Sequence, residues 1–261
     1  MSVPTILEAR GVTKRFGGLT AVKDMDLTVT QGQILGLIGP NGAGKTTFFN
    51  CLTGMETPTA GSVLFHGERM PTRPDLITRA GVGRTFQNIR LFKNMTALEN
   101  VVVGRHTRTK AGVLAAVGRG PRYHREERES EDKARELLQF VGLTKQANEL
   151  AKSLPYGDQR RLEIARALAT EPSLLLLDEP TAGMNARETA QAIDLVKAIQ
   201  GRGISVVLIE HDMRFVFNLC DHVVVLVQGE KLVEGSAEQV QSDERVIAAY
   251  LGKPTDDGTA A

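Results

Sequence analysis

The chain has 261 residues, 24% of them charged, and a formal net charge of +1, which is the composition of a globular protein. Nothing in this balance points to a polyanionic partner, so we expect no nucleic acid. Apolar runs such as those at residues 174–177 and 223–227 are far shorter than the ~20 residues that cross a bilayer, so we expect no membrane span. Pro4 and Glu8 lie where a secretory signal needs an apolar core, so we do not expect export.

In chain order, short apolar runs bounded by turn residues predict four N-terminal strands, over residues 6–9, 25–29, 34–38 and 62–65. The alternation across residues 24–29 is typical of a half-exposed antiparallel strand. The runs at 34–38, 174–177 and 204–209 are instead continuously apolar and are separated by helical stretches. They predict an α/β fold with a buried, mostly parallel sheet and an N-terminal antiparallel β part.

A glycine-rich turn joins the run at 34–38 to a predicted helix at 46–53. Its members are Gly39, Pro40, Asn41, Gly42, Ala43, Gly44, Lys45, Thr46 and Thr47. Glycines let the main chain adopt positive φ and approach a ligand closely, so that successive N–H groups point at an anion. Lys45 can reach the β and γ phosphates, and the Thr46 hydroxyl is placed to ligate a bridging Mg²⁺. This is the P-loop pattern in its strand–loop–helix context, which favours a triphosphate site over a plain connecting turn.

The middle of the chain, residues 96–169, is rich in helix-favouring residues. Within it, residues 125–141 place one apolar stripe along a charged helix, formed by Ala134, Leu137, Leu138 and Val141. We therefore expect an inserted helical subdomain at 96–169.

The rest of residues 1–253, namely 1–95 and 170–253, is then the α/β core of a single domain, followed by a polar tail at 254–261. The stretch 105–123 has five basic residues and no acid. For this stretch a solvated loop is favoured over a site for lipid headgroups or a partner.

Two carboxylates, Asp178 and Glu179, follow the apolar run at 174–177. They lie at the carboxyl end of a predicted strand, where α/β sheets bind ligands. We expect Asp178 to hold Mg²⁺ through its water shell and Glu179 to polarise an attacking water. Adjacent acids also cap helices, but the P-loop upstream favours the catalytic interpretation.

Three further side chains have positions that suit a nucleotide site. His211 and Gln87 each follow an apolar strand, where a histidine can bond the γ-phosphate and an amide can bond water or metal. Phe16 precedes the P-loop, where an aromatic ring can stack on adenine. Each has a plainer alternative: a structural histidine, a surface glutamine and a core phenylalanine.

Over nearly its whole length the chain resembles the ATPase subunit of ABC transporters, which implies a P-loop NTPase core. In that family's order, Phe16 matches the adenine-stacking aromatic, Gln87 the Q-loop and His211 the switch histidine. Asp178 and Glu179 match Walker B and the catalytic glutamate. The family signature matches a segment expected to close over the partner subunit's ATP, formed by Leu154, Pro155, Tyr156, Gly157, Asp158 and Gln159.

Departures from the family pattern narrow the resemblance. Pro155 and Tyr156 replace the Ser-Gly of the signature, and residues 182–185, Ala-Gly-Met-Asn, replace the usual D-loop. Together with residues 84–92, 210–213 and 249–252, these features look like the ATPases of branched-chain amino acid importers. The extra stretch near residues 104–125 is similar to the larger, LivG-type subunit of such systems. Because proline has no hydrogen-bond donor, the resemblance implies that the amides around Gly157 take over the serine's role.

The resemblance implies ATP and Mg²⁺ as ligands, two permease subunits, a second identical or non-identical ATPase subunit and, indirectly, an extracytoplasmic binding protein. The chain would lie at the cytoplasmic face of the cell membrane. Open alternatives for the cargo are urea and other amides, aromatic amino acids, and lipopolysaccharide export. Alternatives of another class are a soluble ABC ATPase acting on DNA or ribosomes, and a nucleotide-binding module without turnover; Glu179 and His211 argue against the latter.

Overall fold

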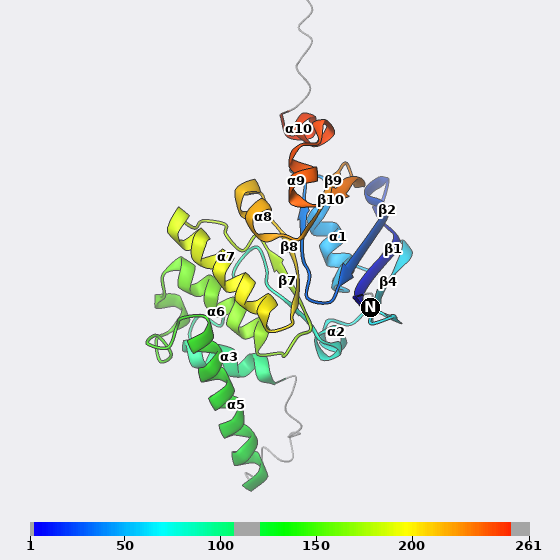
Figure 1. Cartoon of the computed structure of the whole chain (residues 1–261). Coiled ribbons are helices and arrows are strands. Elements are labelled where there is room, and N and C mark those ends of the chain that lie inside the picture. The colour runs from blue at the N-terminus through cyan, green and yellow to red at the C-terminus, as the bar shows by residue number, and fades with distance from the viewer. Residues whose placement is uncertain (1–2, 107–120, 252–261) are drawn as a thin grey trace, which may run out of the picture. The chain divides into compact units, whose positions relative to one another are not determined.

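A computed structural model of the chain describes residues 3–106 and 121–251 (Figure 1). It contains two compact units, Met1–Met70 with Leu208–Ala261 and Pro71–Val207. Most of the basic stretch and the tail at 254–261 lie outside the described residues. In the part of the chain that is described, no helix has the length and apolar character of a membrane span.

An antiparallel sheet opens the first unit, with strands in the order β2-β1-β4-β5. The strands are β1 (Thr5–Phe16), β2 (Leu19–Thr30), β4 (Ala60–Phe65) and β5 (Glu68–Arg69). Burial alternates along β2, where Met25, Leu27 and Val29 are buried between exposed neighbours. The predicted strands at 6–9 and 25–29 were too short, because the β1–β2 hairpin continues through polar residues to its turn at Gly17 and Gly18.

The first unit also contains the strand that leads into the P-loop. β3 (Ile34–Ile38) has all five residues buried and pairs in parallel with β9 (His222–Val227), which pairs antiparallel with β10 (Glu230–Gly235). The helices of this unit are α1 (Lys45–Leu52), α8 (Met213–Leu219), α9 (Ala237–Gln241) and α10 (Glu244–Leu251). Continuous burial of β3 is what its unbroken apolar run predicted.

In the second unit, β6 (Val82–Arg84) and β7 (Leu174–Asp178) form a parallel pair, so that the residues following both strands emerge at one edge. β8 (Ser205–Ile209) crosses the boundary between the two units. These parallel pairs and the antiparallel N-terminal sheet confirm the predicted α/β class. In the chain, helix α2 (Pro74–Ala80) precedes β6, and helix α7 (Ala186–Gly201) lies between β7 and β8.

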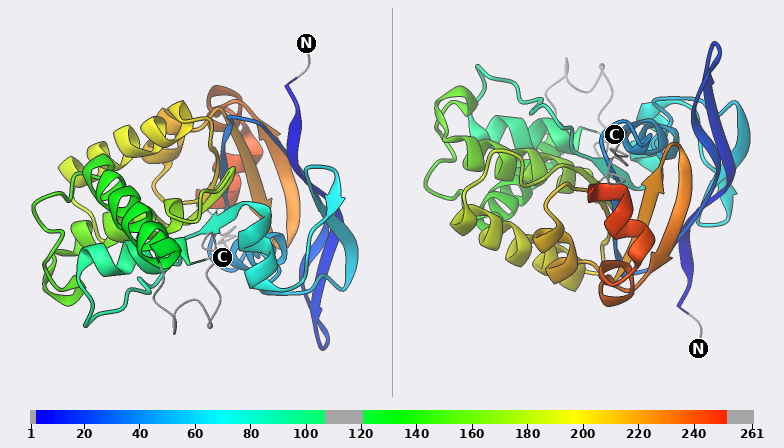
Figure 2. Two further views of the ribbon diagram at one scale, coloured as in Figure 1. Left: turned by 90° about the horizontal axis from the view of Figure 1, so that it is seen from below. Right: turned by 90° about the horizontal axis from the view of Figure 1, so that it is seen from above.

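The predicted helical region forms around three packed helices of the second unit: α3 (Ala97–Arg105), α5 (Pro121–Phe140) and α6 (Tyr156–Leu168). Figure 2 shows α5 in green beside α3 and α6 in both views. All four members of the predicted apolar stripe are buried, which confirms the stripe: Ala134, Leu137, Leu138 and Val141. A short 3₁₀ turn, η1 (Ala151–Ser153), leads toward α6.

Candidate active site

The glycine-rich loop runs from the end of β3 to the start of α1. Gly39, Gly42 and Gly44 have φ of 153°, 77° and 97°. A Cβ on Gly39 would lie 2.0 Å from the carbonyl oxygen of Leu226, and one on Gly44 would lie 2.3 Å from that of Ala21. Both distances are impossible for a side chain, so this loop can be built only with glycine at these two positions.

Lys45, the first residue of α1, folds back over this loop. Its side chain is almost completely buried, and Nζ donates hydrogen bonds to the carbonyl oxygens of Gly39 (2.6 Å) and Pro40 (3.0 Å). The next residue, Thr46, is exposed at the same helix start. The loop thus presents an ammonium, a hydroxyl and the first amides of α1 together, which is the donor set that suits a phosphate chain.

Phe16 and His211 are the other predicted site residues of the first unit. Phe16 ends β1 and is 45% exposed, with Lys14 Nζ 4.9 Å from its ring centroid, so it is not a core residue. His211 lies in the exposed turn between β8 and α8, and its main-chain N–H donates to the buried Glu210 carboxylate at 2.9 Å.

In the second unit the two acids at the end of β7 have different surroundings. Asp178 is 3% exposed; its Oδ2 accepts from Arg84 Nη2 at 3.2 Å, and its main-chain N–H donates to Thr85 Oγ1. Burial raises the pKa of the Asp178 carboxyl, although the Arg84 guanidinium opposes that rise. Glu179 is only half-buried and has a left-handed backbone, with φ of 47°. The strand therefore ends with one fixed and one accessible carboxylate.

Gln87 lies beside the accessible carboxylate. Its Nε2 donates to Glu179 Oε2 at 3.0 Å. The parallel pairing of β6 with β7 explains this contact, because both residues follow neighbouring strands at the same edge. The sequence predicted that each residue follows a strand, but not that they would touch.

The signature segment forms the start of α6. Pro155 is the N-cap residue, with φ of −54° and no side-chain capping bond, and Gly157 is buried in the first turn. Gln159 Nε2 donates to the carbonyl of Leu154 at 2.8 Å, and Asp158 pairs with an arginine one turn along, Arg161. The N–H groups of the first helical turn have no acceptor within the helix and can bind an anion. They are therefore available for the phosphate contact that the resemblance implies for this segment.

One residue of this region was missed by the sequence analysis. Arg160 is completely buried in α6, and it donates to the main-chain carbonyls of Phe86 (2.6 Å) and Gln87 (2.8 Å). It also pairs with Glu163 at 3.1 Å. Residues three apart on a helix can pair, so the contact with Glu163 is of a kind that a sequence can predict. No local sequence pattern indicates that an arginine is buried against a distant loop.

Sequence profiles of known families match two parts of the chain. The family described as "ABC transporter" matches residues 22–182, and the one described as "Branched-chain amino acid ATP-binding cassette transporter" matches residues 230–255. The chain is 48% identical to the high-affinity branched-chain amino acid transport ATP-binding protein BraF of Pseudomonas aeruginosa and 44% identical to LivG of Escherichia coli. Both alignments cover 97% of this chain and 100% of the relative.

Solved structures show the same fold. The ADP conformation of an ATP-binding cassette of an ABC transporter, MJ1267, has a TM-score of 0.84 and 31% identity, over 96% of this chain and 100% of that chain. A dimeric, post-hydrolysis cassette bound to ADP and Pi, MJ0796, has a TM-score of 0.76 and 26% identity, over 89% and 99%. These matches confirm the predicted P-loop NTPase fold and the resemblance drawn from the motifs.

Proposed function

This chain belongs to the family of ABC transporter ATPases, and from that premise we propose that it binds and hydrolyses ATP to power import of branched-chain amino acids. The observation that carries hydrolysis, rather than binding alone, is the acid pair that ends β7. One carboxylate is buried and fixed by Arg84, whereas Glu179 is accessible and held by Gln87. Two acids with different surroundings suit a site in which one carboxylate serves a metal and the other activates water.

Nucleotide binding falls to the first unit. The amides of residues 39–47 and the Lys45 ammonium hold the phosphates, and the exposed ring of Phe16 stacks on adenine. The positive φ at Gly39, Gly42 and Gly44 supports this assignment, because such a main chain can turn successive N–H groups toward one anion.

Magnesium is the metal that this donor set fits. Among the described residues no cluster of three or more His, Cys, Asp or Glu could hold an ion without other ligands. Mg²⁺ usually keeps several waters and takes one or two protein oxygens together with substrate phosphates. We assign Thr46, Asp178 and the Gln87 amide as the residues that hold it. When bound, the ion neutralises charge on the β and γ phosphates.

Hydrolysis proceeds by in-line attack of a water on the γ-phosphorus. Glu179 accepts the water's hydrogen bond and draws off its proton, and His211 bonds the γ-phosphate. Lys45 stabilises the charge that develops on the phosphate oxygens. Gln87 orients the Glu179 carboxylate through the bond described above, so the Q-loop takes part in positioning the base.

We further propose that two cassettes enclose two nucleotides, as the dimeric relative bound to ADP and Pi suggests. Each ATP is then held by the Phe16, P-loop and Asp178 of one subunit and closed by residues 154–159 of the other. The partner is a second copy or a sibling ATPase subunit. Residues 96–169 form the helical subdomain of a single domain spanning 1–253.

The cargo is carried over from the names of the relatives and from the profile match at residues 230–255. Two permease subunits dock at residues 87–92, where Phe92 is 47% exposed, and an extracytoplasmic binding protein acts through them. The subunit is peripheral, at the cytoplasmic face of the membrane. Transport of another cargo by the same ATPase is the second candidate, and copurification of the permeases distinguishes the two.

The test of the hydrolysis assignment is Glu179→Gln, which keeps the shape of the side chain but removes the base. We expect ATP affinity close to that of the parent chain and a loss of turnover of about 10²–10⁴-fold. Phosphate release and a nucleotide titration measure the two quantities on the full-length chain.

Lys45→Ala is the matched variant in the other unit, and it should weaken ATP binding itself. Normal hydrolysis by Glu179→Gln would remove the proposed base. Full binding and turnover in Lys45→Ala would contradict the phosphate site.

A further inference from the structure

Tyr156 is the signature residue that departs most from the family pattern, and it makes two contacts that none of the roles above uses. Its hydroxyl accepts a hydrogen bond from Arg160 Nη2 at 3.1 Å. Its ring lies against Gly183 of the D-loop (residues 182–185): a Cβ on that glycine would be 3.2 Å from Tyr156 Cε1. The ring is still 45% exposed, so its packing alone does not account for a tyrosine here.

Arg160 connects the first contact, at the Tyr156 hydroxyl, to the Q-loop. The same guanidinium that bonds the Tyr156 hydroxyl also bonds the carbonyls of Phe86 and Gln87, and the Gln87 amide bonds Glu179. Arg160 is completely buried, and its Nε has no hydrogen-bond partner among the described residues. Its two terminal nitrogens are fully engaged, so the guanidinium holds the start of α6 against the main chain of the Q-loop.

The second contact depends on a paired departure. Gly183 has φ of 75°, and it stands where the family's usual D-loop has alanine. A side chain there would press on the ring edge, because 3.2 Å is closer than ordinary Cβ contacts. Tyrosine in the signature and glycine in the D-loop therefore suit each other sterically.

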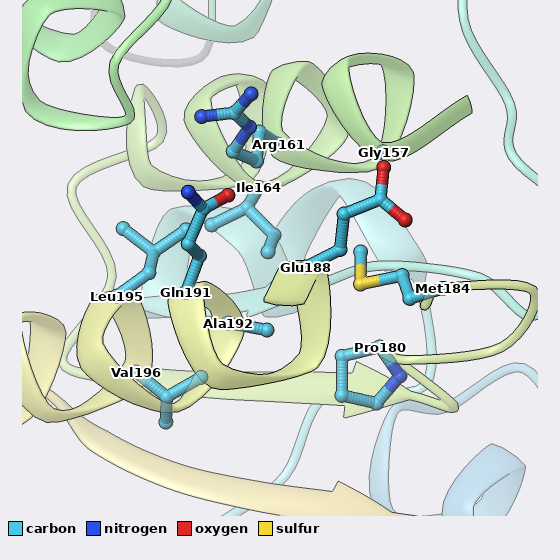
Figure 3. A pocket seen from close by; sticks show the side chains of 10 residues that line it. All are labelled: Gly157, Arg161, Ile164, Pro180, Met184, Glu188, Gln191, Ala192, Leu195 and Val196. Atoms are coloured by element: carbon cyan, nitrogen blue, oxygen red, sulfur yellow. The ribbon is translucent and has the colours of Figure 1, made fainter. Parts of the chain in front are cut away.

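A cavity of about 70 Å³ lies between α6 and α7, bordered by Ile164, Met184 and Leu195. Figure 3 shows the side chains that line it. Near it the Glu188 carboxyl points at Gly157, where a Cβ would be 2.8 Å from Oε1. Glu188 itself belongs to the capping box that starts α7. The signature segment thus lies against Gly183 of the D-loop through Tyr156 and approaches the start of α7 at Gly157.

We propose that Tyr156 is a positioning residue for ATP hydrolysis, which links the D-loop at Gly183, through Arg160, to the Q-loop that holds Glu179. The inference gives Tyr156 a role inside its own subunit, in addition to the closure over the partner's ATP proposed for residues 154–159. It rests on contacts inside the second unit alone, so it stands whichever cargo the transporter carries.

The test uses Tyr156→Phe, which removes the hydroxyl and keeps the ring on Gly183. We expect kcat per ATP-binding site to fall roughly two- to tenfold, with KM for ATP unchanged and the melting temperature lowered by at most a few degrees, the effect of one lost hydrogen bond. A merely structural role would lower the melting temperature and leave kcat per site intact. Counting sites by nucleotide titration separates these outcomes.

A double-mutant cycle tests the path through Arg160. If Tyr156 acts through this arginine, Tyr156→Phe should add no further loss of kcat in an Arg160→Lys background. Arg135→Lys is the control, because Arg135 is an exposed α5 residue paired only with Glu131 in the described contacts, and its kcat should equal that of the parent.

Full kcat in Tyr156→Phe, or losses that multiply in the double variant, would overturn the proposal. Should Arg160→Lys fail to fold, the Tyr156→Phe measurement decides by itself. Glu179→Gln should lose turnover whether or not Tyr156 positions the Q-loop. A failure of the Tyr156 proposal can therefore be distinguished from a failure of the ATPase assignment.

Discussion

The P-loop and the signature segment both present a helix start to phosphate, but they are held in different ways. At α1 the helix follows three glycines with positive φ, two of which lie where a side chain would overlap a main-chain oxygen. At α6 the helix follows Pro155, and Gly157 meets only the carboxyl end of Glu188. The first start is therefore fixed by main-chain geometry, and the second by side chains that lie outside the motif.

This difference explains why one motif matches its family pattern and the other does not. Main-chain geometry can be satisfied by few residue types, so the P-loop tolerates no substitution at Gly39 or Gly44. Side-chain contacts can be replaced in concert, as the fit of Tyr156 against Gly183 illustrates. A residue that departs from the signature pattern should therefore be examined together with the residues that contact it.

The largest expected effect comes from placing the same methyl group in the two segments. Gly39→Ala combines a strained φ with a main-chain clash, so it should lower the free energy of unfolding by about 2–6 kcal/mol and abolish ATP binding. Gly157→Ala needs only a shift of a flexible carboxylate and should cost about 1 kcal/mol or less. Chemical denaturation and nucleotide titration of both variants measure this contrast. Equal stability of the two would contradict it.

The next effect concerns two aromatic rings of equal exposure. Phe16 and Tyr156 are each 45% exposed, but only Tyr156 is hydrogen-bonded to a buried arginine. Phe16→Ala should weaken ATP binding roughly ten- to a hundredfold, the ~1–3 kcal/mol of base stacking, with the melting temperature unchanged. Phe16→Tyr should bind as the parent does. Unaltered affinity in Phe16→Ala would show that this ring does not meet adenine.

A smaller effect is expected where the second helix start lacks a side-chain cap. Pro155→Ser supplies a hydroxyl at the N-cap of α6, a gain of about 0.5–2 kcal/mol, offset by about 0.4–1 kcal/mol for the lost proline. Stability should thus change little, and turnover should hold or rise by at most roughly tenfold through the restored donor. ATPase rates and thermal melts check both quantities. Collapse of turnover would show that this helix start does not face a nucleotide.

The smallest expected effect concerns Tyr250, which lies outside the P-loop motif but contacts Gly39. The main chain of Gly39 hydrogen-bonds the Tyr250 phenol of α10, and partial burial of this side chain, which is 36% exposed, raises the pKa of the phenol to about 12. Tyr250→Phe should lower the free energy of unfolding by about 0.5–1.5 kcal/mol.

The pH dependence of stability identifies this contact. Because the phenol pKa is raised from ~10, the contribution of Tyr250 is complete below about pH 10 and is lost as the pH rises toward 12. Tyr250→Phe should show no such loss when its stability is compared with that of the parent chain over this range. A parallel loss in both proteins would exclude a role for the phenol.

Sequence patterns predicted the buried strands and the local motifs, but not the contacts between distant segments. β3 was predicted with its observed bounds, because a continuously apolar run fits a strand buried on both faces. The β1–β2 hairpin was predicted too short, since ladder pairing continues where apolar alternation stops. The P-loop was recognisable because its chemistry is local. The Gln87–Glu179 bond and the buried Arg160 were not foreseen, because both depend on residues about 70–90 positions apart meeting in the fold.

The left-handed backbone at Glu179 has a consequence for how this chain trades activity against stability. A residue with a Cβ costs roughly 1–2 kcal/mol in that conformation, which glycine would not. Glu179 therefore combines an accessible carboxylate with a backbone conformation that has a thermodynamic cost. A lineage released from hydrolysis would gain stability by relaxing this one position, and glycine there would mark a cassette that still folds but no longer turns over.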